Sequence, residues 1–276
     1  MVKVGIDTRI FKYYDVEYAI SKISKFFKIV EVCATHIKRL ERSCLTIGDI
    51  GNILNRLRKD YGVDIAQIHA PYGDIDELLT YPSEREHAIS RILKYVELCN
   101  IVECPVLVMH VPYRRPMSNE SYIDFIRCLE NSTRYLMRRL DNLLRSYSVK
   151  IAFENRLEQC FGCIPDDIIK IISEEGVENF GICIDTGHAN VNKLNIEDIV
   201  KRFHRYIIAT HVHDNDGIQD RHMPPMMGTI NWRGIIDVFR RYCRDVPLIL
   251  EVEPICDKCC ENMLELCYTI ITRLVS

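Results

Sequence analysis

The chain has 276 residues, of which 47% are apolar and 27% charged, and its formal net charge is −3. These proportions are those of an ordinary globular protein and exclude a disordered or collagen-like chain. No apolar stretch approaches the roughly 20 residues that cross a bilayer, and the first residues enter a strand-like segment without the pattern of a signal peptide. We therefore expect a cytoplasmic protein with no membrane contact, whose overall charge gives no help in binding nucleic acid.

Short β-branched runs alternate with longer segments of helical periodicity along the whole chain. The first helical segment spans 15–27, and Pro82, Ser118 and Pro165 stand near the starts of later helices, where a fixed φ or a capping oxygen is useful. Eight strands are predicted, each followed by a helical segment. Their residues are 2–6, 29–33, 65–69, 106–110, 150–153, 181–184, 207–211 and 248–250.

Eight strand-helix units in 276 residues average about 34 residues each, a length typical of a (β/α)8 barrel. The pattern therefore predicts an α/β protein with a single TIM barrel domain over residues 1–276. An open, doubly wound parallel sheet stays open as an alternative. It is less favoured because the segment after the first strand, GIDTRIF, lacks the glycine-rich phosphate fingerprint of that fold.

Metal-binding residue types gather where the predicted strands end, which is where TIM barrels carry their chemistry. Imidazole and carboxylate groups are the ligands that borderline and hard divalent ions prefer. We interpret His36, His87 and His204, which lie elsewhere, as hydrogen-bonded structural residues. The candidates at the strand ends are His69, His110, Glu154, Asp185, His188, His211, His213, Asp220, His222 and Glu251.

Two pairs among these candidates have informative spacings. His211 and His213 are two residues apart on one strand, so both side chains point into the barrel mouth. At most one of them need bind a metal, and the other can donate a hydrogen bond to a ligand or to substrate. Asp185 and His188 are three apart across the turn that leaves the sixth strand, close enough for one to bind metal while the other faces a second ion or a substrate hydroxyl.

Two arginines and two groups of cysteines have less specific signals. Arg114 and Arg156 follow strand ends and could bind a substrate phosphate, with a solvated loop as the equal alternative. The cysteines of 160–163 and 256–260 would form a zinc ribbon only if both groups converged on one ion. We expect most cysteines to be small buried hydrophobes, and the sequence leaves disulfides open.

The segments IHAPY, HVP, FEN, CIDTGHAN, HVHDN, D-x-H, INW and LILE occur in an order and spacing that resembles the xylose-isomerase-like TIM barrel superfamily, over nearly the whole chain. That superfamily includes sugar and sugar-phosphate isomerases and epimerases. It also includes the endonuclease IV group, which cuts DNA at abasic sites.

The isomerase branch is the favoured expectation, and the resemblance implies one divalent ion, Zn, Mn, Mg or Co, on Glu154, Asp185, His211 and Glu251. It also implies that Glu154 and Glu251 are catalytic: one removes the proton next to the carbonyl of a small sugar or sugar phosphate, and the other returns it on the opposite face through a metal-stabilised enediolate. His188 matches a substrate-contacting position. The state of assembly, monomer or homo-oligomer, is left open.

The endonuclease branch is the alternative, with DNA as partner and up to three zinc ions. Two departures count against it. The chain has CATHIKRLERS where the endonucleases carry a loop that enters DNA, and Val111-Pro112 where they have Pro-Gly. The ligand set that this branch implies is complete: His69, His110, Glu154, Asp185, His188, His211, Asp220, His222 and Glu251.

Overall fold

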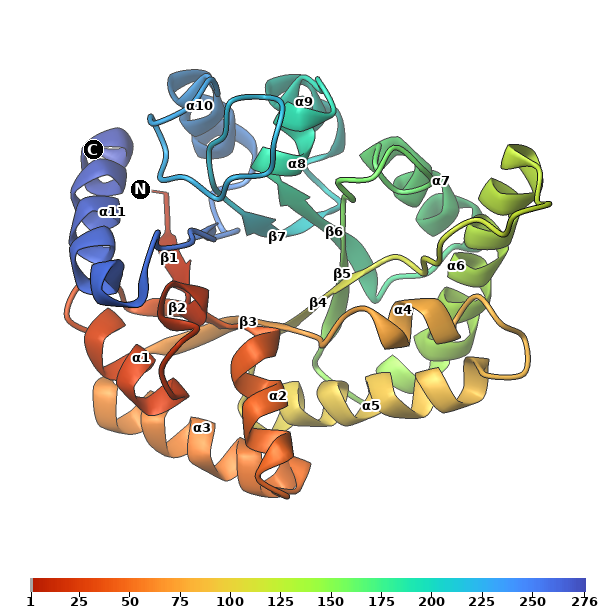
Figure 1. The fold of residues 1–276 in the computed structure, drawn as a ribbon, viewed down its shortest axis with the longest axis horizontal. Helices are drawn as coiled ribbons and strands as arrows, with labels where there is room; N and C mark the ends of the chain where they lie inside the picture. The colour runs from red at the N-terminus through yellow and green to blue at the C-terminus, as the bar shows by residue number, and fades with distance from the viewer. Residues whose placement is uncertain (1) are drawn as a thin grey trace.

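The computed structural model describes residues 2–276 and contains one sheet of eight parallel strands (Figure 1). Consecutive strands are hydrogen-bonded neighbours from β1 to β7, and β8 pairs with β1. Each predicted strand is present, with ends within two residues of those expected. The strands are β1 (Val4–Asp7), β2 (Ile29–Val32), β3 (Asp64–His69), β4 (Val106–His110), β5 (Lys150–Glu154), β6 (Phe180–Asp185), β7 (Ile207–His211) and β8 (Leu248–Leu250).

The seam between β7 and β8 closes the sheet into a barrel. Val212, just beyond β7, bridges to Leu250, and its backbone N–H donates to the carbonyl of Ile249 over 2.7 Å. The hydroxyl of Thr210 donates to the carbonyl of Pro247 at 2.8 Å and accepts the N–H of Ile249 at 3.0 Å. A side chain thus supplies bonds that a regular ladder would supply, and the predicted (β/α)8 barrel is confirmed over the open sheet.

The helices form a ring around the strands (Figure 1). Pro165 is the first residue of α7, as expected. Ser118 is not a cap; α6 begins at Tyr122 because the hydroxyl of Ser121 accepts the N–H of Asp124. The helices are η1 (Thr8–Phe11), α1 (Val16–Ile23), α2 (Ala34–Arg42), α3 (Ile47–Tyr61), α4 (Asp74–Leu78), α5 (Arg85–Ile101), α6 (Tyr122–Leu144), α7 (Pro165–Glu175), α8 (Thr186–Val191), α9 (Ile196–Phe203), α10 (Trp232–Tyr242), η2 (Asp257–Cys259) and α11 (Cys260–Val275).

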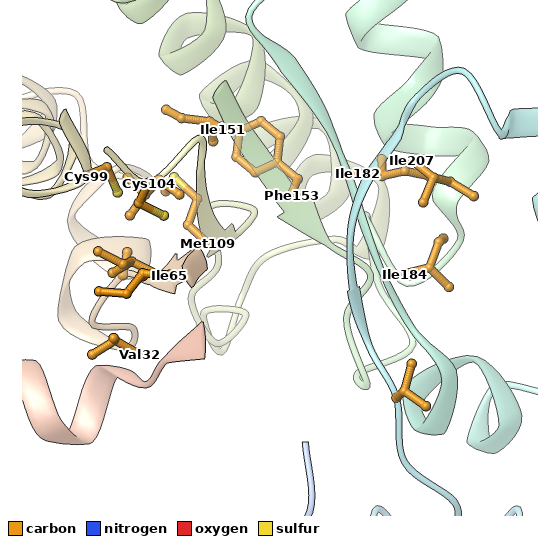
Figure 2. Packing of buried hydrophobic residues seen from close by; sticks show 14 of the residues in the cluster. Val32, Ile65, Cys99, Cys104, Met109, Ile151, Phe153, Ile182, Ile184 and Ile207 are labelled. Carbon is orange, nitrogen blue, oxygen red and sulfur yellow. The ribbon is translucent and has the colours of Figure 1, made fainter. Parts of the chain in front are cut away.

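Alternate residues of the strands build two apolar layers. Side chains such as Met109, Phe153 and Ile184 join the large core between strands and helices (Figure 2). Their neighbours form a separate small cluster: Val106, Val108, Ala152, Cys183 and Ala209. Because side chains of a strand alternate between its two faces, the residues two positions beyond this small cluster point the same way. They are His110, Glu154, Asp185 and His211.

The cysteines do not build a metal site within residues 2–276. Cys256 and Cys259 form a disulfide in the segment between β8 and α11, whereas Cys160 and Cys163 are free. The two cysteine groups therefore do not form a zinc ribbon. In the same part of the chain, no helix is both long enough and apolar enough to span a bilayer.

Candidate metal centre

The carboxyl ends of the strands surround a cavity of about 140 Å³. Each of its walls comes from the end of a strand or from the loop that follows one, which is where the sequence analysis expected the site. Its lining residues are Arg9, His69, Tyr72, His110, Glu154, His188, Asp220, His222 and Glu251.

Four residues form what we call the central group: Glu154 and Glu251, which line the cavity, and Asp185 and His211, which lie buried behind them. One potential ligand atom of each lies within 4.8 Å of every other, and all four side chains are buried. The Nδ1 atom of His211 is 3.2 Å from Glu154 Oε1, 3.5 Å from Glu251 Oε2 and 3.9 Å from Asp185 Oδ2. The structure thus brings together the four ligands that the resemblance implied.

The hydrogen bonding of His211 fits a cation at this point. Its Nε2 lies 3.1 Å from the buried carboxylate of Glu31, so Nε2–H donates there and fixes the ring. Its Nδ1 is buried without a hydrogen-bond partner. Three carboxylates around one buried imidazole nitrogen are unfavourable unless a positive charge lies between them. In the metal-free protein that charge is a proton on the ring, because burial is outweighed by the neighbouring carboxylates, which raise the pKa of His211 well above its ordinary value. The donor set therefore fits a divalent ion held by Nδ1 of His211 and the three carboxylates.

A second group shares Glu154 with the first. The Nε2 atoms of His69 and His110 lie 3.2 and 3.1 Å from Glu154 Oε2, whereas Oε1 of the same carboxylate faces His211. Glu154 therefore presents one oxygen to each group. A bridging carboxylate of this kind is suited to two adjacent cations.

A third group consists of His213, Asp220 and His222. Nε2 of His222 is 3.1 Å from Asp220 Oδ2, and the rings of His213 and His222 stack with centroids 4.1 Å apart. His188 lies at the edge of this group, with Nε2 3.4 Å from Asp220. Within residues 2–276, only three buried side-chain polar atoms lack a hydrogen-bond partner: Nδ1 of His211, Nδ1 of His213 and Oδ1 of Asp220. All three belong to the candidate ligand groups.

Backbone carbonyls orient the remaining histidines. Nδ1–H of His69 donates to the carbonyl of Ala70 at 2.7 Å, that of His188 to Asn155 at 2.9 Å, and that of His222 to Glu251 at 2.9 Å. These tautomers are assigned from the partners, since a carbonyl can only accept. In each ring Nε2 faces the carboxylates, and its lone pair is available to a cation once any second proton on the ring has left. This is the orientation that metal-binding histidines adopt.

The electrostatics keep the carboxylates ionised. Burial would raise the pKa of Glu154, but the charges of His211 and His110 hold it well below its ordinary value. Burial likewise opposes ionisation of Glu251, yet His211, His222 and Arg9 lower its pKa to about 2. For His110 and His222, burial would lower the pKa, and the carboxylates around them instead raise it to about 9.

These shifts predict a pH dependence of metal binding. In the metal-free protein His110 and His222 carry protons up to about pH 9. A metal ion must displace those protons, so affinity should rise between pH 7 and 9, by up to about tenfold per unit for each proton released. The carboxylates are already ionised and add nothing in this range. Competition with a chromophoric chelator at pH 7, 8 and 9 measures the change, and an affinity that is flat over this range would contradict it.

The two arginines considered for phosphate binding are paired within the protein. Arg114 contacts both carboxylate oxygens of Glu120, at 2.7 and 2.5 Å, and Arg156 contacts both oxygens of Glu158 at 3.1 Å. The guanidinium of Arg156 also lies 4.2 Å from the ring centre of Tyr113. Neither arginine lines the cavity. The structure therefore does not bring them to the metal ligands.

The sequence analysis missed two charged residues of the site. Glu31, on β2, accepts from His211, and its signal was an acidic residue inside the apolar run IVEV. Arg9, in η1, reaches Glu251 with Nη1 at 3.1 Å. No pattern in the sequence pointed to Arg9, because arginine does not bind metal ions and a single arginine after a strand is common. His36, by contrast, is the structural residue that was expected: it is buried and contacts Thr8 at 3.1 Å.

Comparison with known proteins places the chain. The family model described as "Xylose isomerase-like TIM barrel" matches residues 29–258. The chain belongs to this family. The uncharacterized protein MJ1311 of Methanocaldococcus jannaschii is 27% identical over 208 residues, which cover 74% of this chain and 69% of that protein.

Solved structures give the fold of this family member further support. A D-tagatose 3-epimerase-like protein is 21% identical with a TM-score of 0.77, and each chain is covered in full. A D-psicose 3-epimerase, solved in the presence of D-fructose, is 14% identical with a TM-score of 0.81 over 99% of both chains. At these identities the likeness carries the barrel fold.

Proposed function

We propose that the protein is a divalent-metal-dependent isomerase or epimerase of a small sugar or sugar phosphate. The observation that carries this proposal is the central group, in which two buried glutamates, Glu154 and Glu251, share a cation-binding position with His211. The family, and the likeness of the fold to a D-psicose 3-epimerase and a D-tagatose 3-epimerase-like protein, support it. Substrate in this cavity would lie against both carboxylates.

The chain's own residues account for the proton transfers of this reaction. A cation on the central group would polarise the carbonyl and hydroxyl oxygens of the substrate and favour loss of the proton between them. Glu154 and Glu251 come from β5 and the end of β8, and both are ionised, so either can accept that proton. In an epimerase the other must first take up a proton, from a substrate hydroxyl or from water, before it can return one on the opposite face.

Phosphodiester hydrolysis at an abasic site is the second candidate, and the second and third groups are the observation that favours it. An isomerase needs one cation, whereas three adjacent ligand groups with a bridging Glu154 would suit three. Three cations together would activate water and neutralise the departing oxygen.

The segment after β2 argues against the second candidate. It forms α2, and two of its cations are tied to the protein rather than free for phosphates: Lys38 donates to the carbonyl of Tyr72 at 3.1 Å, and Arg39 to that of Lys12 at 2.8 Å. Arg42 alone stays exposed, and together with a net charge of −3 this is a weak basic surface for a DNA backbone. We therefore favour the isomerase.

Two assays on one preparation of metal-loaded protein separate the candidates. The first incubates the protein in D₂O with a panel of ketoses and their phosphates and follows deuterium entry next to the carbonyl by NMR. The second is incision of a duplex oligonucleotide with one synthetic abasic site, with and without EDTA. We expect deuterium entry with at least one ketose and no incision.

Matched variants tie either activity to the site. Glu251→Gln should abolish deuterium entry, whereas Glu265→Gln, on the exposed face of α11, should leave it unchanged. Metal-dependent incision that is lost in Glu251→Gln would overturn the isomerase proposal in favour of the nuclease. If protein that is shown to hold metal has neither activity, both the isomerase and the nuclease proposal are overturned.

A further inference from the structure

Two cationic side chains, Arg9 from the cavity lining and Lys12 beside it, both form ion pairs with the carboxylate of Glu253. Arg9 and Lys12 lie at the end of β1, in η1 and directly after it. Glu253 follows β8; its Oε1 accepts from Nε of Arg9 at 2.6 Å, and from Nη2 of the same guanidinium. Its Oε2 lies 2.7 Å from Nζ of Lys12. Figure 1 shows the chain beyond β8 running beside β1.

Arg9 connects this cation pair to the metal centre. Its Nη1 contacts Glu251, a member of the central group, while its Nε/Nη2 edge faces Glu253. That edge is the fork with which arginine binds phosphate or carboxylate through two parallel hydrogen bonds. The three side chains Arg9, Lys12 and Glu253 are each about a quarter exposed, at 25%, 26% and 27%. Solvent therefore reaches all three side chains, and Arg9 also lines the cavity.

Glu253 is free to leave this position. It lies on an irregular segment between β8 and η2, two residues from the almost fully exposed Ile255. Its side chain is held only by the two cations; its backbone N–H is bonded separately, to the carbonyl of His222 at 3.1 Å. A competing anion could displace the carboxylate into solvent without breaking a backbone bond.

We infer that Arg9 and Lys12 form an anion-binding subsite of the substrate cavity, and that Glu253 fills it as an internal substitute for an anionic group of the substrate. This inference rests on the proposed isomerase and narrows its substrate to sugars that carry a phosphate or a carboxylate. A neutral sugar needs only hydrogen-bond partners for its hydroxyl groups, and neutral donors would serve it as well as Arg9 and Lys12. An anionic group, by contrast, gains charge-assisted hydrogen bonds from both cations. The anionic group takes the fork of Arg9 and the ammonium of Lys12 while the reacting carbons lie over the central group.

Binding of inorganic phosphate and of acetate to the metal-loaded protein, by isothermal titration calorimetry, tests the inference without any turnover. Glu253→Gln removes the competing charge, so we expect binding of the preferred anion to tighten about tenfold. Lys12→Met should weaken it about tenfold, because one of two charge-assisted partners is lost. The anion that binds more tightly shows whether the anionic group of the substrate is a phosphate or a carboxylate.

Lys22 and Glu261 provide matched controls. They form an equivalent pair at 2.7 Å, with Lys22 24% exposed, away from the cavity. Lys22→Met and Glu261→Gln should leave anion affinity unchanged, and thermal unfolding and metal content should be measured for every variant. If neither anion binds, or if binding is the same in wild type, Glu253→Gln and Lys12→Met, as for an anion held by the metal alone, the inference is overturned. Isomerase activity on neutral sugars only would overturn it as well, while leaving the proposed function intact.

Discussion

Replacing Glu154 with glutamine is expected to remove the metal of the central group and to weaken the second group as well. Its Oε1 faces His211 and its Oε2 faces His69 and His110, so one substitution takes an anionic ligand from both positions. We expect metal content to fall to a third or less of wild type, and turnover to fall by about 10²–10⁴, the range for loss of a general acid or base. Mass spectrometric metal analysis and the deuterium-exchange assay measure the two effects.

Two further variants, Glu158→Gln and Glu31→Gln, serve as comparisons for Glu154→Gln. Glu158→Gln changes a carboxylate four residues further along that pairs with Arg156, and it should alter neither metal content nor turnover. Glu31→Gln weakens the carboxylate that orients His211, and loss of such a partner lowers metal affinity by about 10–100-fold. Glu154→Gln should therefore be the more severe of the two. Equal metal content in wild type and Glu154→Gln would remove Glu154 from the ligand set.

The periodicity of the strands explains why so much of the site could be predicted. A buried strand with period two leaves only one choice of face for its last residues, so His110, Glu154, Asp185 and His211 had to point into the barrel once their strands were placed. The loop residue Asp220 carried no such constraint; its position rested on the D-x-H resemblance. The structure brings it within 3.1 Å of His222.

Residues that act through another residue could not be predicted in this way. Arg9 acquires its meaning only because β8 pairs with β1 and places Glu251 and Glu253 against η1, more than 240 residues away in sequence. Arg114 looked free in sequence because the partner that occupies it, Glu120, lies in an irregular loop whose path no periodicity describes. Ion pairs within loops depend on the conformation that the loop adopts, and no periodicity of the sequence indicates them.

A single glycine in the turn after β6 is required by the ring of His213. A Cβ atom on Gly187 would lie 1.8 Å from Cε1 of that ring, which is buried, bonded to Asp185 at 3.1 Å and stacked on His222. The ring would have to leave the third group to make room. Gly187→Ala should therefore destabilise the metal-free protein by about 2–3 kcal/mol, the usual cost of overpacking a core.

Gly48 is the matched control, because it is also the second residue of a helix but is exposed. A Cβ there meets only Oγ1 of Thr46, at 3.7 Å, so Gly48→Ala should stabilise the protein by about 0.5–1 kcal/mol through helix propensity. Urea denaturation in the presence of EDTA measures both. In the metal-loaded protein, Gly187→Ala should keep its metal on the central group, since His213 is no member of that group. If Gly187→Ala changed the free energy of unfolding as little as Gly48→Ala does, the close packing of His213 against this turn would not be required.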